Sequence, residues 1–155
     1  MNDELGMVLA IQEARTGIAA GQSPFGAVIV RDGKVVGAGH NEVWKRTDIT
    51  AHAEVVAIQR ACAAISSIDL SGCVIYTTTE PCPMCASAIH WARIERCCCG
   101  ATIADAARAG FNELHLSAQD VYRKGRSPVQ LTAGILREQC AALFGEWMQA
   151  RGRAY

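Results

Sequence analysis

The chain has 155 residues, half of them apolar, so it can bury a hydrophobic core as one domain over residues 1–155. Its 15 basic and 15 acidic residues give zero net charge, which argues against a nucleic-acid partner bound over a broad surface. Neither a secretory signal nor an apolar run long enough to cross a membrane is present, so we expect a cytoplasmic protein whose eight cysteines are reduced.

Apolar spacing and turn residues predict alternating helices and strands along the chain. Asp32-Gly33 is typical of a hairpin turn, Thr50 can cap a helix, and Pro83 suits the first turn of another helix. In order, we expect a helix at 4–20, strands at 26–30 and 34–39, a helix at 51–65, a strand at 73–78, a helix at 83–92, a strand at 96–101, a short helix at 105–109, a strand at 129–132 and a helix at 137–149. This order predicts an α/β fold, a three-layer αβα sandwich around a mixed sheet of about five strands.

Two short motifs stand where a strand gives way to a helix. The first is His52-Ala53-Glu54, and the second is Pro81-Cys82-Pro83-Met84-Cys85. Cys82 and Cys85 are three residues apart at a helix start, so their sulfur atoms share one face near the positive end of the helix dipole. With His52 they make three ligands for a tetrahedral Zn²⁺, one per chain, and the fourth position stays open as in catalytic zinc sites.

Glu54 lies two residues beyond His52, and its carboxylate can reach the same cavity. A glutamate beside a zinc-bound water can take its proton and deliver it to a substrate, so Glu54 is the candidate catalytic residue. His-x-Glu followed by Pro-Cys-x-x-Cys is the signature of zinc deaminases that act on nucleobases. The alternative is a non-catalytic module with a closed zinc site or a Cys82–Cys85 disulfide, which would give Glu54 no role.

At these motifs the chain resembles the cytidine deaminase-like superfamily, in the branch that holds bacterial guanine deaminases and tRNA adenosine deaminases. The resemblance runs nearly end to end and is greatest to the guanine deaminases. It implies hydrolytic conversion of guanine to xanthine and ammonia. It also implies that the substrate is contacted by Phe25, Asn41, Ala53, Trp91, Glu113 and Tyr155.

The resemblance further implies a homodimer in which the C-terminal segment is exchanged, so that Tyr155 closes the site of the neighbouring subunit. One departure concerns Glu113, which stands where the bacterial guanine enzyme has aspartate. The longer side chain leaves room for another substrate, such as guanosine. Cytosine, isocytosine and the adenosine of tRNA stay open as alternatives, although only three lysines and a short Arg151-Gly152-Arg153 tail make a nucleic-acid substrate the less favoured one.

Overall fold

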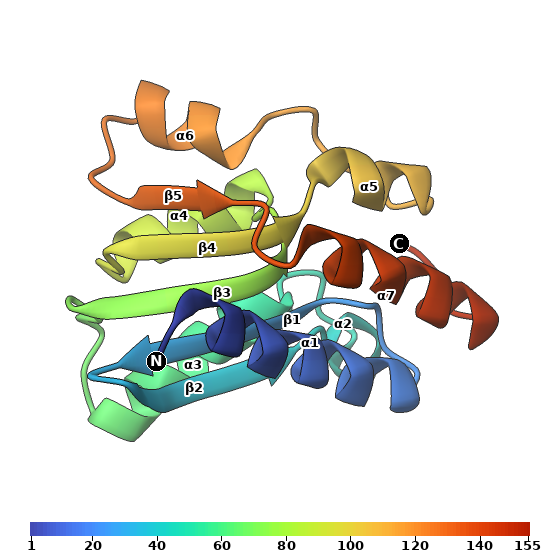
Figure 1. Ribbon diagram of the computed structural model, residues 1–155, viewed down its shortest axis with the longest axis horizontal. Coiled ribbons are helices and arrows are strands. Elements are labelled where there is room, and N and C mark those ends of the chain that lie inside the picture. Colours follow the sequence, from blue (N-terminus) through green and yellow to red (C-terminus); the bar gives the residue numbers. More distant parts are fainter.

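A computed structural model describes residues 1–155 and contains a five-stranded mixed sheet in the order β2-β1-β3-β4-β5 (Figure 1). The strands are β1 (Gly26–Arg31), β2 (Lys34–His40), β3 (Cys73–Thr79), β4 (Arg96–Ala101) and β5 (Gln130–Ala133). Strand β1 is antiparallel to both β2 and β3, whereas β3, β4 and β5 are parallel. The mixed sheet is therefore the one that the sequence predicted.

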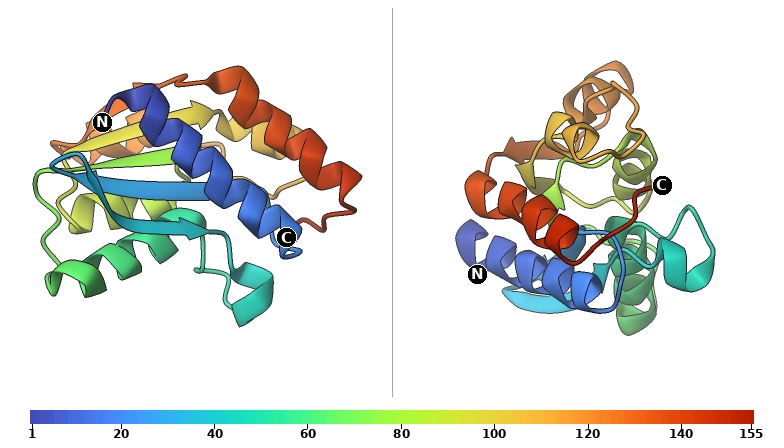
Figure 2. Two further views of the ribbon diagram at one scale, coloured as in Figure 1. Left: turned by 60° about the horizontal axis from the view of Figure 1, so that its bottom comes forward. Right: turned by 90° about the vertical axis from the view of Figure 1, so that its right-hand side faces the viewer.

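Helices cover both faces of this sheet, which confirms the three-layer αβα fold (Figure 2). One face carries α3 (Ala53–Ile65), α4 (Pro83–Trp91) and α6 (Ala118–Lys124), and the other carries α1 (Asp3–Ala19), α5 (Ile103–Arg108) and α7 (Arg137–Gln149). The short α2 (Val43–Arg46) lies between β2 and α3. No helix combines the length and the apolar character that crossing a bilayer requires.

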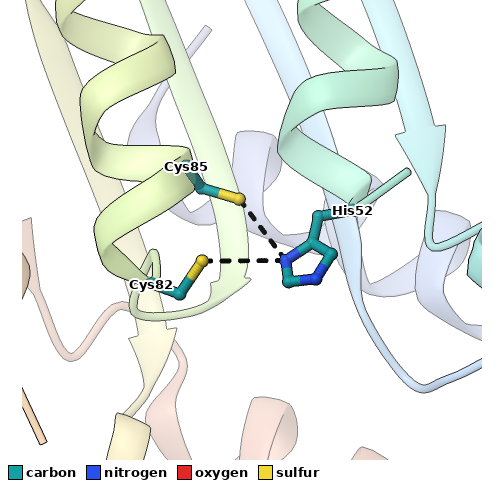
Figure 3. Close-up of side chains that lie close together, drawn as sticks. All are labelled: His52, Cys82 and Cys85. Carbon is teal, nitrogen blue, oxygen red and sulfur yellow. Dashed lines mark hydrogen bonds between the residues drawn. The ribbon is translucent and has the colours of Figure 1, made fainter. Parts of the chain in front are cut away.

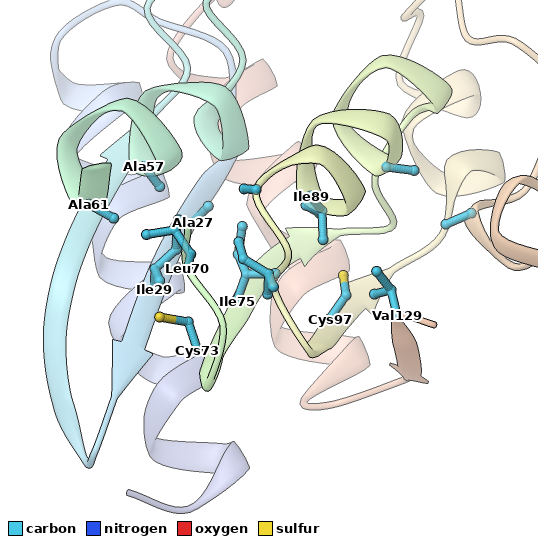
Figure 4. Close-up of a cluster of buried hydrophobic side chains, with 14 of the residues drawn as sticks. Ala27, Ile29, Ala57, Ala61, Leu70, Cys73, Ile75, Ile89, Cys97 and Val129 are labelled. Atoms are coloured by element: carbon cyan, nitrogen blue, oxygen red, sulfur yellow. The ribbon is translucent and has the colours of Figure 1, made fainter. Parts of the chain in front are cut away.

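Each face of the sheet has its own hydrophobic core. The core under α3 and α4 includes Ile29, Ile75 and Cys97 (Figure 4). Cys98 points the other way and joins the core under α1 and α7, as expected for neighbouring residues of a strand. All eight cysteines are free.

Three local expectations need correction. Helices α2 and α6 were not predicted, because four and seven residues are too few for apolar spacing to stand out. Thr50 does not cap α3, since its hydroxyl donates to Asp48 (2.6 Å) and the N-cap position belongs to His52. Helix α5 begins at Ile103 rather than at Asp105, because Thr102 and Asp105 form a capping box.

Close packing brings α3 directly onto β2. A Cβ atom at Gly37 would lie 2.5 Å from the carbonyl oxygen of Ala57 and 2.8 Å from the amide nitrogen of Ala61, so only glycine fits there. The N-terminal ends of α3 and α4 lie at the edge of the sheet where β3 ends. Because β1 is antiparallel to β2 and β3, the first residues of β1 and the last residues of β2 lie at the same edge. The sequence motifs converge at this edge.

Candidate active site

His52, Cys82 and Cys85 lie together at the start of α3 and α4 (Figure 3). His52 and Cys82 are the N-cap residues of these helices, but neither side chain caps its own helix. Both point instead toward the gap between the helices. The Nδ1 atom of His52 is 3.7 Å from the Sγ atom of Cys82 and 3.5 Å from that of Cys85.

These distances fit a tetrahedral metal site. Zinc bonds of about 2.1–2.3 Å place the ligand atoms of a tetrahedral site about 3.4–3.8 Å apart. The three ligand atoms lie within 4.8 Å of one another, and no fourth histidine, cysteine or carboxylate joins them. The residues present thus fit one zinc ion with one coordination position left for a ligand that the protein does not supply.

The two thiols differ in their surroundings. Hydrogen bonds from Cys85 and from His52 lower the pKa of Cys82 to about 4, so Cys82 is a thiolate, the form that binds metals. The neighbouring Cys82 thiolate and burial raise the pKa of Cys85. A bound divalent ion would favour the thiolate form of both cysteines.

Glu54 lies in the first turn of α3 and is only 6% exposed. Burial raises the pKa of its carboxyl group, and the nearby Cys82 thiolate raises it further. The Thr77 hydroxyl lies 3.3 Å from Oε1 of Glu54 and also 3.1 Å from the Thr79 carbonyl oxygen. A buried carboxyl group with a raised pKa beside a metal site is suited to accept a proton and to return it.

Two adjoining cavities open onto two of the three ligands, His52 and Cys82. The inner one is small and is lined by Phe25, His52, Glu54, Thr79, Glu80, Cys82, Glu113 and Tyr155. The outer one, of about 290 Å³, is lined by Ile49, His52, Cys82, Pro83, Met84, Phe111, Asn112, Glu113, Leu114 and Tyr155. No lysine or arginine lines either cavity, so the only charged side chains there besides the metal ligands are glutamates.

Three of the six residues expected at the substrate line these cavities, and a fourth lies behind them. Phe25, Glu113 and Tyr155 line them, and burial raises the pKa of Glu113 to about 7. Asn41 is fully buried behind Tyr155, and its Nδ2 group donates to the Tyr155 hydroxyl at 2.7 Å. The centre of the Tyr155 ring lies 5.8 Å from that of the His52 ring, so the last residue of the chain lies beside one of its metal ligands.

Ala53 and Trp91 are placed differently. Ala53 stands between His52 and Glu54, but its side chain is fully buried in the core under α3. Trp91 is 80% exposed at the C-terminal end of α4 and lines a separate cavity of about 920 Å³. Eight residues of helix span about 12 Å, so the expected substrate contact of Trp91 is not met within this chain.

Sequence reasoning missed several residues of the site. Glu80 lines the inner cavity, and its Oε1 atom accepts a hydrogen bond from the amide of Ala118, which fixes the start of α6. Thr77 lies on a strand, where a threonine is easily interpreted as packing. The apolar residues at the mouth, Ile49 and Leu114, are in loops and carry no motif, so no sequence signal pointed to them.

Comparison with known proteins decides the family. Residues 1–101 match the family described as "Cytidine and deoxycytidylate deaminase zinc-binding region". The chain belongs to this deaminase family. Its members' chemistry identifies the protein as a hydrolytic deaminase with zinc as its cofactor, in agreement with the geometry of the three ligands.

Individual relatives of this deaminase differ in substrate. Guanine deaminase of Bacillus subtilis is 46% identical over 114 residues, which is 73% of each chain. The tRNA-specific adenosine deaminase of the same organism is 32% identical over 147 residues, covering 95% of this chain and 89% of the relative. A solved structure in complex with 2,6-diaminopurine is 29% identical, has a TM-score of 0.87, and covers 99% of this chain and 85% of its own.

Proposed function

We propose that this deaminase acts on a free purine base and that guanine is its substrate. The observation that carries the proposal is the lining of the cavity, which offers apolar walls and glutamate side chains but no cation. Carboxylates accept hydrogen bonds from ring N–H and amino groups, and guanine presents both at N1 and C2. A phosphate group at this mouth would meet negative charge alone.

The structure of a relative with 2,6-diaminopurine supports this choice, because that base also carries an amino group at C2. The guanine deaminase relative is 46% identical over 73% of this chain, whereas the tRNA-specific adenosine deaminase of the same organism is 32% identical over 95% of it. A tRNA substrate therefore remains the second candidate, and the assay below includes it.

In the proposed reaction, guanine and water give xanthine and ammonia. His52, Cys82 and Cys85 would hold the zinc ion, which would lower the pKa of water toward 7 and so make a nucleophile available at neutral pH. Glu54 takes a proton from the attacking water and delivers protons to the ring nitrogen and to the leaving amino group. Its burial keeps bulk water from competing for these protons.

Other side chains hold the base. Phe25 and Tyr155 offer aromatic surfaces to the ring plane, and Glu113 accepts hydrogen bonds from its edge. Asn41 acts through Tyr155, because its Nδ2 group fixes the hydroxyl of that residue. The side chain of Glu113 is one methylene longer than the aspartate of the bacterial guanine enzyme. The ratio of kcat/KM for guanine to that for guanosine therefore tests whether this longer side chain changes the choice of substrate.

We further propose that the enzyme is a homodimer in which each C-terminal segment stays on its own subunit. The hydrogen bond between Asn41 and Tyr155 indicates that the C-terminal segment is long enough to reach the site of its own chain. Light scattering should give the mass of two chains. Mixing Glu54→Gln chains with chains that lack Tyr155 should leave KM at the raised value of the Tyr155-deleted chains, whereas exchanged segments would complete one intact site and lower KM toward the wild-type value.

The substrate assay measures ammonia release from guanine, guanosine, adenine, cytosine, isocytosine and a tRNA anticodon stem-loop that contains adenosine. We expect guanine to be turned over with the highest kcat/KM, with xanthine as the product. Glu54→Gln should keep bound zinc and lose at least about 100-fold in kcat. Preference for the stem-loop over every free base, or full activity of Glu54→Gln, would overturn the proposal.

A further inference from the structure

The last five residues of the chain do not extend into solvent but cross from α7 to α2 (Figure 2). Chain ends usually fray unless other residues hold them. Here Trp44 of α2 holds the segment in two ways. Its Nε1 group donates to the Arg153 carbonyl oxygen at 3.0 Å, and the Arg153 guanidinium carbon lies 3.5 Å from the centre of its ring.

These contacts decide where Tyr155 lies, because only one residue separates it from Arg153. The Tyr155 ring packs edge-on against Trp44, with ring centres 6.2 Å apart, and against Phe111, with ring centres 5.6 Å apart. Its hydroxyl then reaches Asn41, and its ring comes to lie near His52. Trp44 itself lines neither cavity at the metal ligands, so it has no direct access to a substrate.

Helix α2 can hold the C-terminal segment because ion pairs fix α2 to the rest of the fold. The carboxylate of Glu42, at its N-cap, is 2% exposed and pairs with Arg46 (2.6 Å) of α2 and with Arg60 (2.8 Å) of α3. Arg60 also donates to the carbonyl oxygen of Ala38 in β2 at 2.8 Å. The platform that carries Trp44 is therefore tied to both a strand and a helix of the main fold.

We propose that Trp44 is a positioning residue that acts through Arg153 to keep Tyr155 over the active site. The proposal rests on the proposed role of Tyr155 at the substrate. It assigns to α2 a function that depends on one indole ring. Trp44 does not touch the base, and removing it affects the base only by releasing the C-terminal segment.

The first experiment needs no substrate. Carboxypeptidase A removes C-terminal aromatic residues, and intact-mass spectrometry then follows the loss of Tyr155. One hydrogen bond and one cation–π contact together correspond to about a tenfold change in the population of the released segment. We expect Trp44→Ala to lose Tyr155 about tenfold faster than the wild type and Trp44→Phe to show an intermediate rate. Ile68→Ala, which shortens another large exposed side chain, serves as the control and should behave as the wild type.

The second experiment is a double-mutant cycle on turnover. Trp44→Ala and deletion of Tyr155 should each raise KM about tenfold and change kcat by less than about threefold. Because both changes remove the same element, the double variant should resemble the deletion alone. Urea unfolding of each variant shows that the fold is retained.

The outcomes separate this inference from the proposed function. Equal rates of Tyr155 release in Trp44→Ala and the wild type would refute the proposal that Trp44 holds the C-terminal segment, whatever the substrate is. Faster release with additive effects on KM would refute the action through Tyr155. A wild type that does not turn over guanine would refute the substrate proposal. The release experiment would still test whether Trp44 holds the C-terminal segment.

Discussion

Replacing Glu42 with glutamine removes a buried negative charge and keeps the size and the hydrogen-bonding oxygen of the side chain. The carboxylate accepts charge-assisted hydrogen bonds from Arg46 and Arg60 at 2.6 and 2.8 Å. Such bonds contribute about 1 kcal/mol more than neutral ones, so two of them account for about 2 kcal/mol. Glutamine is easier to bury, and both arginines can turn to solvent, so we expect a net loss of about 1–2 kcal/mol.

Urea unfolding at pH 7 measures this loss, and Glu138→Gln, on the exposed side of α7, is the matched control, expected within about 0.5 kcal/mol of the wild type. Burial alone would raise the pKa of Glu42, but the hydrogen bond from Arg46 and the charges of Arg46, Arg60 and Lys45 outweigh it and lower the pKa below its ordinary value. The stabilisation is therefore complete above the pKa of the unfolded chain and declines as pH falls through the lower, folded value.

The difference between wild type and Glu42→Gln should accordingly be constant from pH 7 to pH 6 and should shrink below about pH 4.5. Equal stability at pH 7, or a difference that persists unchanged to pH 3, would show that the ion pairs do not stabilise this platform. The same variant should also release Tyr155 faster to carboxypeptidase A, because α2 carries the residue that holds it.

Three further predictions concern the site and its support. Cys85→Ala should reduce zinc, measured by plasma mass spectrometry, from one ion per chain to well below one, and retention of a full equivalent would exclude Cys85 as a ligand. Thr77→Val should lower kcat about 3–10-fold at unchanged KM while Thr77→Ser stays near the wild type, because only valine lacks the hydroxyl 3.3 Å from Glu54; equal kcat in both would remove Thr77 from the reaction. Gly37→Ala should lower the free energy of unfolding in urea by about 1–3 kcal/mol, since the new methyl group meets the backbone of α3. Gly145→Ala, whose methyl group meets nothing within 4 Å, should be neutral or stabilising. Similar effects of the two substitutions would contradict the packing argument.

The metal ligands and the buried carboxyl group beside them were predictable because zinc deaminase chemistry requires fixed residue types at short spacing. His52 and Glu54 are two residues apart, and Cys82 and Cys85 are three apart, so each pair is local in sequence. What the sequence could not supply is the distance between the pairs. That distance follows from β3, which places the two helix starts side by side at one edge of the sheet.

Tertiary contacts explain the parts that sequence reasoning missed. Helix α2 is one turn long and depends on Glu42, whose partner Arg60 lies 18 residues away. The contact of Asn41 with Tyr155 spans 114 residues, and no local pattern predicts it. Trp91 is a separate case: a resemblance marked it as a substrate contact, and the length of α4 places it away from the ligands of its own chain.

The three metal ligands come from two helices, and 30 and 33 residues separate His52 from Cys82 and Cys85. An ion held by all three works as a staple between α3 and α4, and it finds this arrangement only in the folded chain. Binding to the native state alone adds about 4 kcal/mol to the free energy of unfolding when free zinc exceeds its Kd a thousandfold. Scarcity of zinc would therefore lower the fraction of folded enzyme as well as the catalytic rate. The lifetime of the protein would then depend on the supply of the metal.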